Sequence, residues 1–249
     1  MKQIKFFSLA LSSLISATAW SGTAGPLPVE KSWTWAASVS GGFAVARAGE
    51  TETFFLAPGI EKSYVAQKDN NTLATGEVFF GVHKWLQGQS AMQLGLALST
   101  TGNADLQGVI WDDASPLFDN HKYQYKIRNT RIALKGKFIF DNIWMVNPWV
   151  SATAGVGFNR AHSFDNQPVI FQALPNNNFE NNTKTAFSYG FGAGVQKNIN
   201  QHWHVGVGYE FSDWGKSQLD RARGQTLGTG LSLNHLYTNG ATITLGYVA

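Results

Sequence analysis

The sequence predicts an all-β fold, an eight-stranded antiparallel up-and-down transmembrane β-barrel. Three observations carry this prediction: apolar residues recur at every second position, short and long connections alternate, and aromatic residues gather at strand ends. The composition agrees, because 14% of the 249 residues are charged, whereas soluble domains usually carry about 25%. The absence of cysteine excludes disulfide frameworks, cysteine-ligated metals and thiol catalysis.

The first residues have the pattern of a secretory signal peptide. Lys2 and Lys5 form a basic start, an apolar stretch covers residues 6–15, and residues 17–19 read Ala-Thr-Ala. This stretch is shorter than the roughly 20 residues that a spanning helix needs. We expect residues 1–19 to be removed, with cleavage after 19 or 24, and residues 20–32 to form a periplasmic segment. The barrel is expected in residues 33–249, and the nearly neutral mature chain gives no electrostatic basis for nucleic-acid binding.

Alternation of apolar with small or polar residues has the period of a β-strand. Val150, Ala152, Ala154, Val156 and Phe158, for example, alternate with Ser, Thr, Gly and Asn. The expected strands are 33–45, 73–85, 92–99, 131–140, 150–159, 187–196, 203–212 and 235–247.

One register is left open, in the fourth expected strand. Tyr123, Tyr125 and Ile127 fall on the parity opposite to Ile132 and Leu134. Either a bulge or an extension beyond the membrane would account for the change.

The connections separate a membrane barrel from a soluble sandwich. Segments 86–90, 141–147 and 197–202 are short, whereas 46–72, 101–122, 161–183 and 215–230 are long, and the two kinds alternate. Outer-membrane barrels have short periplasmic turns and long extracellular loops, whereas a sandwich has similar loops at both ends. The alternation therefore predicts a barrel with four long extracellular loops.

Aromatic residues are expected to form belts at the two membrane–water interfaces. The belt at the short-turn ends is predicted to contain Trp33, Trp35, Trp85, Trp149, Trp203 and Tyr247, with Trp144 in a turn, and the opposite belt Phe43, Phe158, Phe187 and Phe211.

Three blocks of sequence carry a resemblance to a known class: residues 75–81 (TGEVFFG), 206–217 (GVGYEFSDWGKS) and 234–240 (NHLYTNG). With these blocks the chain resembles the eight-stranded outer-membrane barrels of the opacity-protein and OmpA-like class over nearly all of 33–249. The resemblance implies a cell outer membrane location and no cofactor. It also implies roles as adhesins, small porins or structural surface proteins.

The same resemblance implies insertion by the barrel-assembly machinery through a C-terminal signal. Thr238, Gly240, Ile243 and Leu245 fit that signal, and Tyr247 would supply its aromatic ring because the chain ends in Ala249.

Charged residues are expected inside the barrel. Glu77, Arg131, Lys135, Lys137 and Glu210 fall on the lumen-facing parity, together with Gln93, Gln196 and His204. An eight-stranded barrel is only wide enough for its own side chains, and unpaired buried charges are costly. Counted from the short-turn ends, Glu77, Arg131 and Glu210 are expected at similar heights. We expect them to form a salt-bridged plug, with a proton or ion path as the alternative.

Catalytic and metal sites are not expected. The six histidines are scattered, and Asp112-Asp113, which has the oxygen ligands that Ca²⁺ prefers, is more simply a solvated acidic loop. An outer-membrane lipid-acyl hydrolase would need a His–Ser pair with a nearby carboxylate, but Leu236-Tyr237-Thr238 follows His235. The chain is therefore predicted not to be an enzyme.

Specific function is expected in the long loops. They contain apolar clusters around Phe54, Trp111, Phe118, Phe171 and Phe179. Two interpretations remain open: the clusters pack together as an ordered cap, or Trp111, Phe118 and Phe171 contact a host surface or matrix. The sequence thus predicts a monomeric surface barrel in contact with outer-membrane lipid, with a small porin-like channel for ions or solutes as the alternative.

Overall fold

The computed structural model describes residues 33–86, 90–140, 145–171, 173 and 176–249. They belong to the second of two compact units, Lys31–Ala249. The expected signal peptide and periplasmic segment lie outside the described residues, as does Trp144. Among the residues that the structure describes, no helix is long and apolar enough to span a bilayer.

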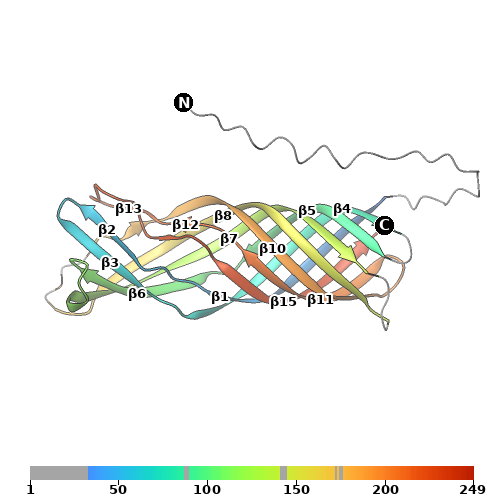
Figure 1. Cartoon of the computed structure of the whole chain (residues 1–249), viewed down its shortest axis with the longest axis horizontal. Coiled ribbons are helices and arrows are strands. Elements are labelled where there is room, and N and C mark those ends of the chain that lie inside the picture. Colours follow the sequence, from blue (N-terminus) through green and yellow to red (C-terminus); the bar gives the residue numbers. More distant parts are fainter. Residues whose placement is uncertain (1–32, 87–89, 141–144, 172, 174–175) are drawn as a thin grey trace, which may run out of the picture. The chain divides into compact units, whose positions relative to one another are not determined.

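Eight strands form a closed antiparallel ring in the order of the chain (Figure 1). The last strand pairs with the first, from Ala36 opposite Val248 to Ala46 opposite Thr238. This ring confirms the predicted eight-stranded up-and-down barrel. Its strands are β1 (Thr34–Arg47), β4 (Asn70–Trp85), β5 (Ala91–Thr101), β7 (Asp119–Ile139), β8 (Asn147–Pro168), β10 (Asn182–Asn198), β11 (Trp203–Asp213) and β15 (Tyr237–Val248).

The outer face of the ring is apolar. Val39, Phe80, Leu96, Phe187 and Ile243 all expose more than half of their surface. A continuous exposed band of this kind is unfavourable in water but suits lipid. Since every strand of the ring has two neighbours, its backbone polar groups are paired without water. The band therefore identifies the membrane-spanning part of the barrel.

The long connections contain strands of their own, so they are not the simple loops that the sequence predicted. The additional elements are β2 (Glu52–Ala57), β3 (Ile60–Gln67), β6 (Ala104–Asp112), the 3₁₀ turn η1 (Pro116–Phe118), β9 (Phe179–Glu180), β12 (Ser217–Gln218), β13 (Asp220–Ala222) and β14 (Ser232–Leu233). β2 pairs with β3, β3 with β6, and β6 with the first half of β7.

These strands continue the barrel wall beyond the membrane, at the left in Figure 1. β13 pairs with β9, and the backbone N–H groups of Thr226 and Leu227 donate to the Leu56 carbonyl of β2 at 2.9 and 3.1 Å. We call this part the extension: β2, β3, β6, β9, β13 and residues 119–128 and 161–168 of β7 and β8.

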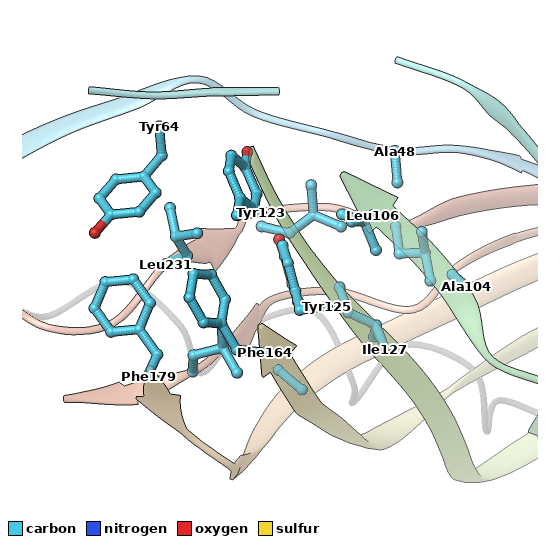
Figure 2. Close-up of a cluster of buried hydrophobic side chains, with 14 of the residues drawn as sticks. Ala48, Tyr64, Ala104, Leu106, Tyr123, Tyr125, Ile127, Phe164, Phe179 and Leu231 are labelled. Atoms are coloured by element: carbon cyan, nitrogen blue, oxygen red, sulfur yellow. The ribbon is translucent and has the colours of Figure 1, made fainter. Parts of the chain in front are cut away.

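The extension has a hydrophobic core, drawn in Figure 2. Phe164 packs against Tyr123, Tyr125 and Phe179 at ring-centroid distances of 5.9, 6.4 and 4.9 Å. Around these rings lie Tyr64, Leu73, Leu106, Ile110, Ile127, Leu219, Leu231, Leu233 and Leu236. Of the predicted apolar loop clusters, Phe54, Ile110 and Phe179 pack in this core, as the cap interpretation expects, whereas Phe118 and Phe171 are exposed.

The extension also explains the parity of β7. Tyr123, Tyr125 and Ile127 point inward, as Arg131 does, along one continuous strand. The irregularity lies across from it, in β8, where Ser163 has a φ of 58°. In the membrane the barrel turns its apolar face outward, whereas in water it must turn that face inward. The change of pattern therefore marks the membrane boundary.

Three buried tyrosines make the extension sensitive to alkaline pH. Burial raises the pKa of Tyr64, Tyr123 and Tyr125 above the ordinary value of 10.0, and neighbouring charges add to this effect. Their neutral forms stabilise the folded state, so this stability is present in full below pH 10.0 and is lost as the pH rises toward the folded-state pKa values.

We expect tyrosinate absorbance to show a group of tyrosines that titrates above the rest, with protease cleavage of the extension increasing over the same pH range. Titration of all tyrosines near their ordinary pKa, with the extension still resistant to protease, would contradict this.

Candidate functional site

A lysine bridges two carboxylates in the middle of the lumen. Lys135 of β7 donates from Nζ to Glu77 Oε1 of β4 and, at 3.1 Å, to Glu210 Oε1 of β11. Ser99 Oγ of β5 donates to the second oxygen of Glu77 at 2.9 Å. The lysine and Glu77 side chains are about nine-tenths buried, and that of Glu210 is 24% exposed. The bridge ties opposite walls of the barrel together.

Arg131 lies beside this bridge but has different contacts. It is 2% exposed; its Nη1 donates to Ser212 Oγ at 3.4 Å, and its guanidinium lies 4.7 Å from the ring centroid of Trp214. Within the described residues it forms no ion pair, so its predicted salt bridge to Glu77 and Glu210 is wrong, and Lys135 is their partner instead. A cation over an indole face is stabilised by the ring quadrupole, so Arg131 and Trp214 fill the lumen as a pair.

The chain after β11 folds back into the barrel mouth. Trp214 Nε1 donates to Thr238 Oγ1 at 2.9 Å, and Asn159 Nδ2 donates to the carbonyls of Trp214 and Lys216 at 2.6 and 2.9 Å. A Cβ on Gly157 would lie 3.1 Å from the Trp214 carbonyl oxygen. Trp214 continues the inward parity of Glu210 and Ser212, although it lies just beyond β11.

The lumen is also filled at the short-turn end. Lys137 Nζ donates to Gln196 Oε1 at 2.6 Å and lies 4.7 Å from the ring centroid of Trp149. Trp149 is 4% exposed, so its predicted place in the lipid-facing belt is wrong. Val150 faces lipid, and the side chain before it must face inward. A Cβ on Gly208 would lie 2.3 Å from the Trp149 ring, so this glycine makes room for the indole.

Little space remains around the network. One cavity of about 30 Å³ lies against Glu77, Arg131 and Trp214, and another of about 20 Å³ lies against Lys135 and Trp149. Each has room for about one water molecule. The expected charges therefore gather in one plug, in which Lys135 is bridged and Arg131 and Lys137 pack on indole rings.

The first aspartate of the acidic loop is ion-paired. Asp112 accepts from Lys62 Nζ at 2.6 Å and from Asn120 Nδ2 at 2.7 Å. Burial raises the pKa of Asp112, but hydrogen bonds from Lys62 and Asn120 outweigh it and hold that pKa below its usual value. The described residues contain no group of three or more His, Asp or Glu side chains arranged for a metal.

The histidine considered for lipid hydrolysis pairs with an aspartate. His235 Nδ1 lies 2.8 Å from Asp213 Oδ2. Asp213 Oδ1 accepts from the Gly215 N–H at 2.8 Å. A serine hydroxyl does meet a histidine elsewhere, where Ser163 Oγ lies 2.8 Å from His162 Nδ1 in the exposed wall of the extension.

The three loop-contact candidates have different environments. Trp111 is half-buried in β6, and its neighbour Ile110 is fully buried in the extension core. Phe118 is 47% exposed and Phe171 fully exposed.

The two connections that carry Phe118 and Phe171 meet where the Val169 N–H donates to the Asn120 carbonyl at 2.8 Å. We call the exposed residues Leu117, Phe118, Val169, Ile170 and Phe171 the apolar tip.

A recess opens in the extension as well. It has a volume of about 550 Å³ and is lined by Lys62, Asp112, Asn120, Asn176, Arg223 and neighbouring residues. The extension therefore combines an apolar tip with a recess of mixed polar and apolar lining.

The predicted C-terminal signal lies in β15. Ile243 and Leu245 face outward, and Tyr247 packs against Trp203 with the ring centroids 5.2 Å apart. Gly240 lies against β1, because a Cβ there would be 2.0 Å from the Phe43 carbonyl oxygen. The glycine thus permits close contact at the seam where the barrel closes.

No family model matches the chain, and no curated protein matches it. Among solved structures it is similar to the outer membrane protein OprG from Pseudomonas aeruginosa, with 14% identity, coverage of 86% of this chain and 95% of that chain, and a TM-score of 0.45. It is also similar to Neisserial surface protein A (NspA), with 12% identity, coverage of 86% of this chain and 96% of that chain, and a TM-score of 0.43. A third similar structure is the outer membrane protease OmpT from Escherichia coli, with 10% identity, coverage of 91% of this chain and 99% of that chain, and a TM-score of 0.46. This chain is a transmembrane β-barrel similar to outer-membrane barrel proteins.

Proposed function

We propose that this protein is a surface barrel of the cell outer membrane that contacts a host surface or matrix through the apolar tip. In such barrels the long connections face the extracellular medium, so we expect the extension to lie outside the cell. The observation that carries the proposal is the exposure of Leu117, Phe118 and Phe171. They remain exposed while the apolar residues behind them are packed into a core.

The tip has the properties of a contact site. Exposed apolar clusters usually mark interaction surfaces, and aromatic residues supply much of the energy of interfaces. The hydrogen bond between Val169 and Asn120 holds the two connections together on a rigid sheet. A preorganised surface loses less entropy on binding, so the extension is suited to present the tip.

The lumen does not favour the porin-like alternative. The Lys135 bridge, the Arg131–Trp214 pair and Trp149 occupy it at successive levels. A solute would have to displace buried charges, which is costly. The plug therefore supports a structural role for the membrane part.

We also propose that the chain is inserted by the barrel-assembly machinery through β15 and works as a monomer. The outward Ile243 and Leu245 lie on the strand that closes the barrel. Since the ring has no free strand edge, a second chain is not needed to complete the membrane part.

The proposal predicts that polar substitution of the tip abolishes surface binding without unfolding the barrel. We expect Phe118→Ser/Phe171→Ser to weaken attachment of protein-bearing vesicles to matrix-coated plates by about tenfold or more, as loss of two interface anchors does. Leu227→Ser is the matched control, because Leu227 is exposed on another connection.

Heat-modifiable gel migration should be unchanged in all of these variants. Attachment of the Phe118→Ser/Phe171→Ser vesicles at the wild-type level would refute a role for the tip.

A further inference from the structure

Two arginines face each other on the outer wall just above the apolar band. Arg128 of β7 is directly opposite Arg160 of β8, and both are exposed. The next pairs toward the short-turn end are Thr130 with Phe158 and Ile132 with Val156. The two arginines thus occupy the next pair of outward-facing positions beyond those that face lipid.

Like charges in directly opposite positions destabilise an antiparallel pair, and here neither is neutralised within the described part of the chain. Lys126, one pair further from the membrane, lies 3.5 Å from Asp105. Asp165 accepts from Gln167 at 3.2 Å. The nearby carboxylates therefore have other partners.

The pKa of His162 is affected by the same positive charges. Burial lowers its pKa, and the charges of Arg160, Lys126 and Arg128 lower it further. These cations therefore lie close enough together to act on a single imidazole. An anion bound between them would relieve their repulsion.

We propose that Arg128 and Arg160 bind the phosphate groups of an anionic glycolipid in the outer leaflet of the membrane. Guanidinium groups bind phosphate with paired, charge-assisted hydrogen bonds. The position directly above a lipid-facing band is the headgroup level of a bilayer. Phe158 and Ile132 lie below the arginines and offer apolar surface to acyl chains, which favours a lipid over a free ion.

The test measures lipid retention by the purified full-length protein in detergent micelles, read by native mass spectrometry. The probes are diphosphoryl lipid A, the same lipid without phosphates, and inorganic phosphate as competitor. The variants are Arg128→Gln/Arg160→Gln and Arg128→Lys/Arg160→Lys. Arg221→Gln/Arg223→Gln is the control, because it removes two positive charges around β13 in the extension.

We expect the glutamine variant to retain diphosphoryl lipid A about tenfold less well than the wild type, as loss of charge-assisted bonds implies. Retention of diphosphoryl lipid A by the lysine variant should lie between that of the wild type and that of the glutamine variant. Retention by the control should equal that of the wild type. Lipid without phosphates should be retained weakly by every variant.

Equal retention by the wild type and the glutamine variant would overturn the site, and so would equal retention of both lipids by the wild type. Full displacement by millimolar inorganic phosphate would overturn the assignment to a lipid headgroup. Heat-modifiable migration verifies that each variant is folded, and the single variant Arg160→Gln, with a smaller expected loss, replaces the double one if that fails to fold. The result does not depend on the apolar tip.

Discussion

Replacing Lys135 by methionine is expected to lower the free energy of unfolding by about 3–5 kcal/mol, the usual cost of leaving a buried charge without its partner. The substitution removes the donor that Glu77 and Glu210 share. Two carboxylates would then face each other across a lumen with room for few waters. We expect the midpoint of urea unfolding in detergent, read by heat-modifiable migration, to fall accordingly.

Two further variants distinguish the bridge from simple loss of a lysine. Lys137→Met removes a lysine whose hydrogen-bond partner is the neutral Gln196, so it should cost less. Adding Glu77→Gln and Glu210→Gln to Lys135→Met should recover most of the lost stability, because no carboxylate then stays unpaired. Equal losses for Lys135→Met and Lys137→Met, with no recovery in the triple variant, would refute the bridge.

The second large effect is expected in the extension. Phe164→Ala should remove about 3–5 kcal/mol of stability from its core, as large-to-small substitutions of buried phenylalanine do. Phe164 contacts Tyr123, Tyr125 and Phe179, so the cavity would lie at the centre of the cluster in Figure 2. The membrane-spanning ring does not include this core and should remain folded.

We therefore expect Phe164→Ala to make the extension sensitive to protease while heat-modifiable migration persists. Phe171→Ala, at a fully exposed position, is the matched control and should leave the extension resistant. A protease-resistant extension in Phe164→Ala would show that the core contributes little to its order.

The membrane part was predictable because lipid imposes a strict rule on every second residue. The outward Val39, Leu96 and Ile243 alternate with small or polar residues, so their strands and their faces follow from period alone. The prediction for Trp149 is wrong because it rests on residue type, whereas the same rule, through the outward Val150, turns Trp149 inward.

The plug was predictable in its membership but not in its contacts. Parity places Glu77, Lys135 and Glu210 inside, but their pairing depends on the stagger between strands that are far apart in sequence. Trp214 lies just beyond β11 on the same parity as Glu210 and Ser212, so the period indicates its direction but not its contacts with Arg131 and Thr238.

The extension could be predicted only as one of two alternatives, for a different reason. The outer face of its strands meets water, so the inward positions carry apolar residues. Tyr123, Tyr125 and Ile127 therefore lie on the same inward parity as Arg131. Read alone, that change is compatible with either a bulge or an extension. The pairing of β3 with β6 and of β6 with β7 joins segments from two different connections, and such contacts leave little local signal.

The central claim, that the membrane part is a closed plug and that function lies in the extension, is tested most directly by single-channel recording. Purified wild-type protein reconstituted in planar bilayers should give no steady conductance, while an open porin added to the same bilayer conducts. Large, steady currents from the folded monomer would contradict the claim, because they would require a continuous aqueous path past Lys135, Arg131 and Trp149.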